Sequence, residues 1–230
     1  MAEHNDRKAA VDPANDIQRL VELYRDEADR AFRSIPHSDL VELAWMCAKA
    51  YGDGRRLYAC GNGGSVGILD NLCADLNAMP RASDDKSAVN LGSWSAFRAI
   101  NLYTSASEFT AAANDRGFDG AYAEILSAIG AADDLLLAVS GSGNSKNILA
   151  AVAAARSMGM RVCGITRNAA GKLYAERQHG EMVLLVDLRS EFPGQTGGNN
   201  ANMHMEDIVC KIGHMVSGIL RTCAQGGHRE

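Results

Sequence analysis

Apolar runs of strand length alternate with segments of helical periodicity along most of the chain. Four runs, at residues 57–60, 135–139, 161–166 and 182–188, predict strands, and the uninterrupted run at 135–139 is typical of a strand covered on both faces. A shorter fifth candidate lies at residues 88–91. Apolar residues recur three and four positions apart in the segments between them, which predicts helices. The alternation predicts an α/β fold with a doubly wound, mostly parallel sheet.

Two helices are expected before this alternation. Residues 16–32 have a long amphipathic pattern that Pro36 stops, and Ser38 can cap a second helix. A helical pair in this position can complete the core of an α/β domain. It can also form a surface on which copies of the chain assemble.

The two ends of the chain differ in their pattern. Residues 1–14 are charged and rich in alanine, so we expect a disordered tail there. Residues 201–223 carry apolar side chains at helical spacing and predict a long C-terminal helix. The segment 15–224 is then expected to form a single domain, because it is long enough for one substantial core.

The most informative turn follows the strand at 135–139. It reads SGSGNS, from Ser140 to Ser145, and helical spacing begins near Asn144. Free backbone N–H groups and the positive end of the helix dipole meet at such a turn, and serine hydroxyls can donate to the same anion. An ordinary capped turn can have the same residues. As a ligand site, the turn suits a single phosphate monoester.

A second strand, glycine loop and helix unit occurs about eighty residues earlier. The sequence GNGGS, at residues 61–65, directly follows the strand at 57–60, and its glycines permit positive φ and close approach to a ligand. In open parallel sheets, ligands bind beyond the carboxyl ends of the strands. We therefore expect both loops to face one ligand.

Composition and charge narrow the classes of ligand and partner. The net charge of −5 and the isoelectric point near 5.7 disfavour nucleic acid as a partner. No run approaches the roughly 18 apolar residues of a membrane span, and the start of the chain does not have the pattern of a signal peptide. Neither a P-loop nor a G-x-G-x-x-G pattern is present, so no nucleotide cofactor is expected. The six cysteines are scattered, which predicts reduced thiols and a cytoplasmic protein.

The two loops and the segment between them resemble a known family. GNGGS after one strand, SGSGNS after a later strand and NDRGF at 114–118 resemble the sugar isomerase (SIS) domain, over about residues 17–224. Their order and spacing are most similar to the phosphoheptose isomerases, which act on sedoheptulose 7-phosphate. The resemblance implies a flavodoxin-like three-layer fold and an aldose–ketose isomerase that transfers a proton between C1 and C2 through an enediol. It also implies a homotetramer with the helices at 15–52 in its core.

The functional positions of that family can be placed on this chain residue by residue. The implied catalytic acid–base pair is Asp75, on the helix after GNGGS, and His214, on the last helix. The implied substrate-binding residues lie in the two loops, on the candidate strand at 88–91 and near the start of the last helix: Asn62, Gly63, Ser65, Asn90, Ser140, Ser142, Ser145 and Glu206.

A zinc site is implied only in altered form. Phosphoheptose isomerases often hold zinc with His and Glu on the first of these helices and Gln and His on the last, and the matching positions here are Asn71, Asp75, Glu206 and His214. Asn71 is a poor zinc ligand, so the candidate metal ligands are Asp75, Glu206 and His214. The altered set indicates either a site retuned for another sugar phosphate or a lost catalytic function.

A non-catalytic interpretation of the same residues also stands. Asp75 can be a solvated surface charge, His214 a packed core histidine and Glu206 a first-turn charge that the helix dipole favours. Some SIS proteins are tetrameric adaptors for a replication initiator, and others sense a sugar phosphate within regulators. The acid, the base and both loops are retained here, which favours the enzyme.

Overall fold

A five-stranded parallel sheet forms the centre of the computed structural model, which describes residues 13–78 and 97–226. The strand order is β2-β1-β3-β4-β5, and every adjacent pair is parallel. The strands are β1 (Arg56–Cys60), β2 (Arg98–Asn101), β3 (Leu135–Val139), β4 (Arg161–Thr166) and β5 (Met182–Leu185). β3 lies in the middle with all of its residues buried. The predicted parallel α/β sheet is confirmed.

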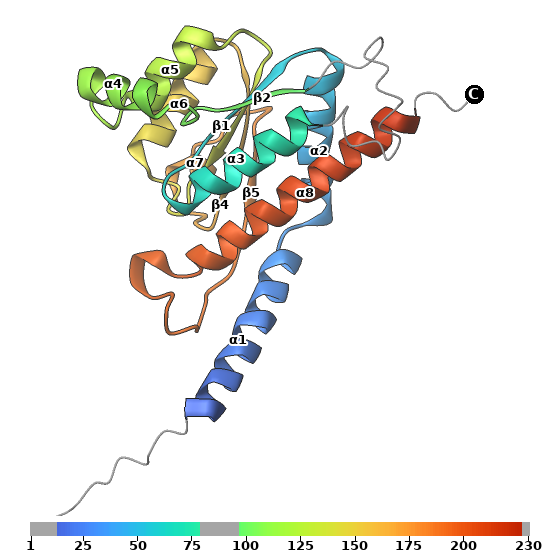
Figure 1. Ribbon diagram of the computed structural model, residues 1–230, viewed down its shortest axis with the longest axis vertical. Helices are drawn as coiled ribbons and strands as arrows, with labels where there is room; N and C mark the ends of the chain where they lie inside the picture. The colour runs from blue at the N-terminus through green and yellow to red at the C-terminus, as the bar shows by residue number, and fades with distance from the viewer. Residues whose placement is uncertain (1–12, 79–96, 227–230) are drawn as a thin grey trace, which may run out of the picture.

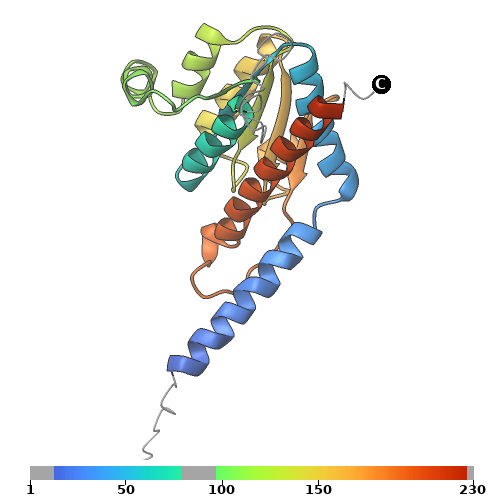
Figure 2. The same ribbon diagram turned by 45° about the vertical axis from the view of Figure 1, so that its right-hand side comes forward.

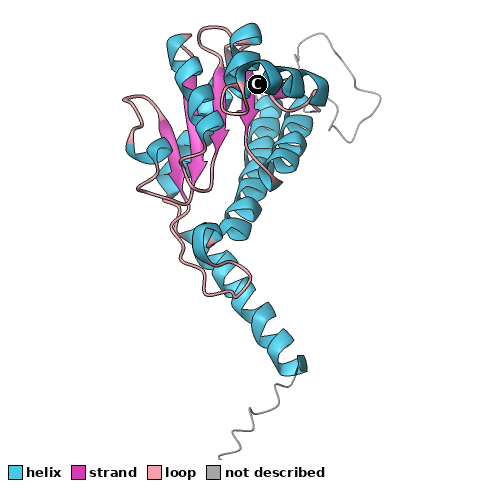
Figure 3. Ribbon diagram, turned by 90° about the vertical axis from the view of Figure 1, so that its left-hand side faces the viewer, coloured by secondary structure: helices cyan, strands magenta, loops and turns pink. Residues whose placement is uncertain are grey.

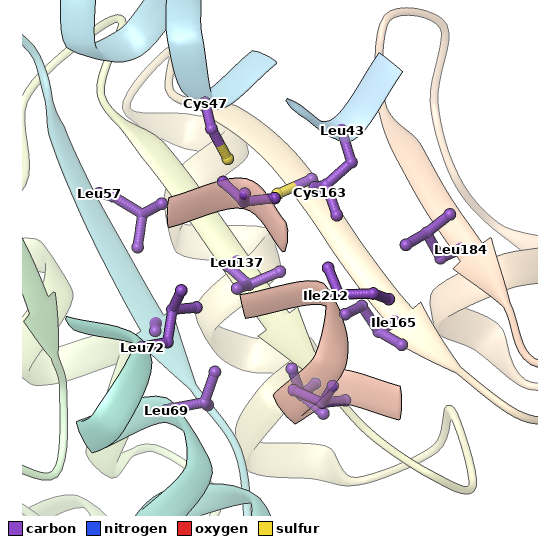
Figure 4. Close-up of a cluster of buried hydrophobic side chains, with 14 of the residues drawn as sticks. Leu43, Cys47, Leu57, Leu69, Leu72, Leu137, Cys163, Ile165, Leu184 and Ile212 are labelled. Atoms are coloured by element: carbon purple, nitrogen blue, oxygen red, sulfur yellow. The ribbon is translucent and has the colours of Figure 1, made fainter. Parts of the chain in front are cut away.

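Three helices cover one face of the sheet (Figure 3). They are α2 (His37–Gly52), α3 (Gly64–Asn77) and the long C-terminal helix α8 (Asn202–Gly226). Their apolar side chains pack against alternate residues of the strands, and Figure 4 shows Leu57, Leu137 and Ile165 of the sheet in one cluster with Ile212 of α8. This packing buries the side of the sheet on which α3 and α8 lie.

Four further helices contribute to the opposite face. They are α4 (Ala106–Arg116), α5 (Ala121–Ile129), α6 (Lys146–Ser157) and the short α7 (Lys172–Ala175). Their apolar residues form a second core with the strand side chains that point away from α8, such as Tyr58 and Leu136. Because helices pack on both faces, the sheet is doubly wound, as the sequence predicts.

The edge strand β2 was not among the predicted strands. It has only four residues, and side chains of α3 hold its backbone in place. The Asn77 amide donates to the Ala99 carbonyl and accepts from the Ala99 N–H, both at 2.8 Å, while the Asn101 amide donates to Asp70 Oδ1 at 2.7 Å. These partners come from another element, so the local apolar pattern does not reveal the strand. The strand candidate at 88–91 lies outside the described residues.

The first helix, α1 (Pro13–Arg33), extends away from the sheet (Figures 1 and 2). Its largest contact is with α8, and two of its apolar side chains, Ile17 and Val21, are exposed. The predicted N-terminal helical pair and long C-terminal helix are confirmed. Within the described ranges, none of the helices combines the length and apolar character needed to cross a membrane.

Candidate active site

A pocket lies at the carboxyl edge of the sheet, between the loops that follow β1 and β3. These strands are adjacent, with Cys60 opposite Ala138, so the two loops leave the sheet side by side. The pocket has a volume of about 190 Å³. Its lining comes from the end of β3, both loops, the residue after β4, the 3-10 helix η2 (Gly197–Asn199) and the N-terminal ends of α3 and α8: Asn62, Ser65, Val139, Ser140, Gly141, Ser142, Ser145, Arg167, Gly198, Asn199, Asn202 and Glu206.

The two remaining residues of the predicted binding set do not line this pocket. Gly63 lines a neighbouring hollow of about 430 Å³ whose walls are largely aromatic and which shares Asn62 with the first pocket. The backbone of Gly63 has a φ of 58° and forms the N-cap of α3, a conformation that favours glycine. Asn90 lies outside the described residues.

The loop after β3 presents hydroxyl and amide groups to the pocket. Ser145 is the N-cap residue of α6, yet its side chain makes no capping hydrogen bond. The first backbone bond of this helix runs from the Leu149 N–H to the Ser145 carbonyl, which leaves the preceding amides of the first turn without helical acceptors. Ser140 Oγ donates to Ser145 Oγ at 3.0 Å, so the two hydroxyls lie together. These donors at a helix N-terminus form a suitable site for one phosphate group.

A pair of asparagine amides joins the two loops. Asn62 Nδ2 donates to Asn147 Oδ1 at 3.0 Å, and Asn147 Nδ2 donates back to Asn62 Oδ1 at 2.7 Å. Asn147 is buried, and its Oδ1 also accepts the Ile148 N–H at 3.0 Å. The pair leaves Asn62 with one free N–H and one free oxygen lone pair for a ligand. The orientation of Asn62 is therefore set by a residue in the first turn of α6, the helix that follows the other loop.

The carboxylate of Glu206 lies against the start of α3. A side-chain carbon placed on Gly64 would overlap Glu206, so only glycine at this position lets the carboxylate approach the helix N-terminus. Asn202, one turn earlier on α8, donates to Glu206 Oε1 at 3.0 Å. Glu206 is therefore held at this pocket beside Ser65, close to the positive end of the α3 dipole.

The predicted acid–base pair, Asp75 and His214, meets between α3 and α8, which run side by side in the same direction (Figure 1). Asp75 Oδ2 lies 3.7 Å from His214 Nε2, and Asn71 Nδ2 lies 3.3 Å from the same nitrogen. Arg221 contacts Asp75 from two turns further along α8, at 4.0 Å from Oδ1. His214 is more exposed than Asp75, with exposed side-chain fractions of 59% and 32%. The pair is thus accessible from outside the chain.

The candidate metal ligands do not form one cluster. Asp75 and His214 meet, but Glu206 lies eight residues before His214 on α8, a separation of about 12 Å along the helix axis. Nowhere in residues 13–78 and 97–226 do three His, Cys, Asp or Glu side chains gather closely enough to hold a metal ion. Because Asn71 is a weak donor, the residues as they lie do not fit a zinc centre. Zinc binding stays a prediction.

A buried polar cluster supports the segment that closes the pocket. Glu27 of α1 is fully buried and accepts the Ser190 hydroxyl and the Glu191 N–H, both at 2.6 Å, and the His204 Nε2–H at 2.9 Å. Burial acts to raise the pKa of Glu27, but these hydrogen bonds outweigh it, so the pKa is lowered. Gln195 accepts the Met203 N–H at the start of α8. The cluster therefore ties α1 to the segment that ends in the pocket at Gly198.

Several residues of the site were not predicted, and three of them contribute polar side chains that the argument uses. Arg167 and Asn202 line the pocket, and Asn147 supports it from below. Arg167 directly follows the predicted strand at 161–166, so its place at the carboxyl edge could have been found. Asn202 and Glu206 are four residues apart on a predicted helix, a spacing at which side chains interact. The Asn147 contact joins residues 85 positions apart and has no local signal.

The comparisons with known proteins agree with this fold. The family model for the SIS domain matches residues 24–167. The chain therefore belongs to the SIS domain family.

Its relatives include phosphoheptose isomerases. The chain is 35% identical over 150 residues to the phosphoheptose isomerase of Chlorobaculum parvum, an alignment that covers 65% of the chain and 66% of the relative. It is 33% identical over 199 residues to the phosphoheptose isomerase of Aromatoleum aromaticum, covering 84% and 91% of the two proteins. The solved structure of the phosphoheptose isomerase GmhA from Neisseria gonorrhoeae matches 90% of this chain and 99% of its own, with 25% identity and a TM-score of 0.74.

Proposed function

We propose that this protein is a sugar-phosphate isomerase that interconverts a ketose phosphate, such as sedoheptulose 7-phosphate, and the corresponding aldose phosphate. The activity named for its relatives supports this function. The observation that carries the proposal is the position of the Asp75–His214 pair. The pair lies on α3 and α8, the same two helices whose N-terminal ends contribute Ser65 and Glu206 to the pocket.

The phosphate group would bind at the N-terminus of α6, where Ser140, Ser142 and Ser145 surround it. The sugar carbons would then extend along α3 and α8 toward the acid–base pair. Glu206 and His214 are eight residues apart, or about 12 Å along α8. That separation suits an extended seven-carbon chain better than a three-carbon one.

Isomerisation requires one group that moves a proton on carbon and another that serves the two oxygens. In the ketose-to-aldose direction, one member of the pair removes a proton from C1 while the C2 carbonyl oxygen gains one, which forms the enediol. The enediol then loses the O1 proton and gains a proton at C2, so the aldose forms without net loss or gain of atoms. Asp75 and His214 lie 3.7 Å apart, close enough to serve adjacent carbons. No step in this scheme passes through a metal.

Proton NMR in deuterated water tests the function. The purified protein is mixed with sedoheptulose 7-phosphate, and we expect deuterium at C1 together with new aldose signals. Asp75→Asn or His214→Gln should lower turnover by roughly 10²–10⁴-fold, as loss of a positioned acid or base does. The matched controls Asp29→Asn and His179→Gln change exposed residues on other parts of the chain and should keep wild-type turnover. Parallel samples with a chelator and with added zinc test the predicted metal.

Two outcomes would contradict the proposal in different ways. Full turnover in both the Asp75 and the His214 variants would show that other residues carry the chemistry. If no sugar phosphate underwent exchange, with or without zinc, while the same compounds raised the melting temperature, the protein would be a sugar-phosphate-binding member of the family. Zinc-dependent exchange in the wild type would support the metal site despite the separation of Glu206 from the pair.

We also propose that the chain works as a homotetramer in the cytoplasm. Exposed apolar side chains on α1 and α2, among them Ile17, Val21 and Trp45, support an assembly that covers these helices. All six cysteines are free thiols, and burial raises the pKa of Cys47 and Cys60 to about 12. Free thiols of this kind suit a reducing compartment.

A further inference from the structure

Arg167 places a guanidinium group in the phosphate pocket. It directly follows β4 and lines the pocket together with Ser140, Ser142 and Ser145. A side-chain carbon added to Gly141 would lie 3.3 Å from Arg167 Nε, so the arginine passes directly over the backbone of the serine loop. The glycine at position 141 leaves room for this approach.

The guanidinium has donors that the protein itself does not use. Its NH2 group donates to the Gly198 carbonyl in η2, which holds the side chain across the pocket. Arg167 Nε is buried without a hydrogen-bond partner. In the described part of the chain, no carboxylate lies within ion-pair distance of Arg167, although Glu206 lines the same pocket. Burial also lowers the pKa of the guanidinium, as expected for a cation that lacks a counter-ion.

Arg167 as a whole is only partly buried, but an enclosed donor of a cation such as its Nε–H is costly to leave without an anion. A guanidinium can donate two parallel hydrogen bonds to phosphate oxygens, a geometry that a serine hydroxyl cannot provide. The serine loop supplies neutral donors only, whereas a phosphate monoester loses its second proton near pH ~6 and then carries two negative charges. Arg167 therefore adds the charge that the loop does not have.

We propose that Arg167 is a phosphate-binding residue that selects the dianionic form of the phosphate ester. This assignment rests on the proposed function, because it takes a sugar phosphate as the ligand. Arg167 is held over the loop by Gly198, and its Nε–H and remaining N–H groups complete the set of donors around the phosphate. Selection of the dianion then comes from one arginine rather than from the net charge of the protein, which is negative.

Two small probes of similar shape test the charge selection without the sugar. Methyl phosphate is a dianion above its second pKa, and methyl sulfate is a monoanion throughout. Calorimetric titration at pH 8 should show that the wild-type protein binds methyl phosphate more tightly than methyl sulfate, and that this preference shrinks as the pH falls to 5. Arg167→Gln should weaken methyl phosphate binding roughly 10- to 100-fold and reduce the preference, because a charge-assisted hydrogen bond is lost.

Two further variants separate charge from structure. Arg167→Lys keeps the charge but not the two-pronged geometry, so it should retain the preference for the dianion with weaker binding. Arg177→Gln removes the same charge from an exposed site and should bind both probes as the wild type does. Circular dichroism and melting curves verify that each variant is folded.

The results distinguish this proposal from the proposed function. If Arg167→Gln binds methyl phosphate as tightly as the wild type and keeps the same preference, Arg167 is not a phosphate ligand, and isomerisation of sedoheptulose 7-phosphate by the same sample leaves the enzyme assignment intact. If the wild type binds neither probe, the Arg167 assignment is wrong. If the wild type also fails to isomerise any sugar phosphate, the proposed function is wrong as well.

Discussion

At the scale of single residues, the site depends on side chains that lie outside the pocket and orient the pocket-lining side chains by hydrogen bonds. Asn147 does not line the pocket, but it forms both hydrogen bonds that fix the Asn62 amide between the two loops. Because Asn147 is buried and also accepts the Ile148 N–H, its orientation is set by α6. The Asn62 side chain in the loop after β1 is therefore oriented by the first turn of α6.

Asn147→Ala should impair the binding of sugar phosphate through Asn62. Without its partner, the Asn62 amide can rotate, and we expect the KM to rise by about tenfold with a smaller change in kcat, since the acid–base pair lies elsewhere. Steady-state kinetics of Asn147→Ala, Asn62→Ala and the double variant form a double-mutant cycle. A coupling of about 0.5–3 kcal/mol in kcat/KM is expected for residues in contact. Additive effects would instead show that Asn147 only stabilises the fold.

At the scale of elements, α1 is joined to the pocket by the buried polar cluster around Glu27. The Tyr24 ring packs against the His204 ring, tilted by 43° at a centroid distance of 4.3 Å, and its hydroxyl donates to Asp207 Oδ2 at 2.6 Å. Burial, with Asp207 beside it, raises the pKa of Tyr24, so the hydroxyl stays protonated. The start of α8 and the segment from Ser190 to Gly198 are therefore positioned by a helix that projects from the rest of the molecule (Figure 2).

The lowered pKa of Glu27 predicts how stability responds to acid. The folded protein holds the Glu27 proton less tightly than the unfolded chain, so this group stabilises the fold above pH ~4.5 and the contribution is lost as the pH falls through the folded pKa. Urea unfolding between pH 3 and pH 8 measures this contribution to the free energy of unfolding. Glu27→Gln should lower the free energy of unfolding by roughly 1.5–3 kcal/mol at pH 7 and should flatten the loss below pH 5.

The control for this prediction is Glu22→Gln, which changes an exposed carboxylate on the same helix. It should leave both the stability at pH 7 and its decline in acid close to those of the wild type. An equal acid response in Glu27→Gln and the wild type would show that other groups control the decline.

The elements differ in how far the sequence alone predicts them. β3 and α6 were predicted because an apolar run and a helical period are both local signals, and the two loops were recognised from the residues between them. β2 was missed because it is only four residues long and its backbone is held by a distant side chain, that of Asn77 in α3. The contact of Glu27 with His204 joins residues 177 positions apart, so no local pattern could predict it. Asp75 and His214 were placed by family resemblance, and the structure brings them together.

At the scale of the whole molecule, the exposed apolar side chains of α1 are the feature that most strongly favours assembly. Ile17 and Val21 are exposed by 63% and 53%, on the same face of α1 as Tyr24, which contacts α8 one to two turns further along the helix. Trp45 of α2 is exposed by 63%. Apolar side chains clustered on projecting helices are typical of surfaces that another protein chain covers.

A charge placed on this surface should weaken the assembly. We expect the wild-type protein to sediment as a tetramer and Val21→Asp to shift it toward smaller species, because a carboxylate would be buried at the interface. Analytical ultracentrifugation over a range of concentrations measures the change. Gln18→Asp adds the same charge at an exposed polar position of α1 and serves as the control. A wild-type protein that sediments as a monomer would contradict the prediction.

Through the buried carboxyl of Glu27, the proposed assembly of subunits is linked to the affinity of the pocket for substrate. Its hydrogen bonds connect α1 to the segment that ends at Gly198, and Gly198 holds Arg167 in the pocket. If assembly fixes the position of α1, then dilution into separate chains should make the pocket residues more mobile. The apparent affinity for substrate should therefore decrease as the protein concentration is lowered. By reciprocity, a saturating sugar phosphate should keep the subunits together at dilutions where the free protein dissociates. The substrate would then act as a ligand of the assembly, and the abundance of the protein would help to determine how tightly it binds.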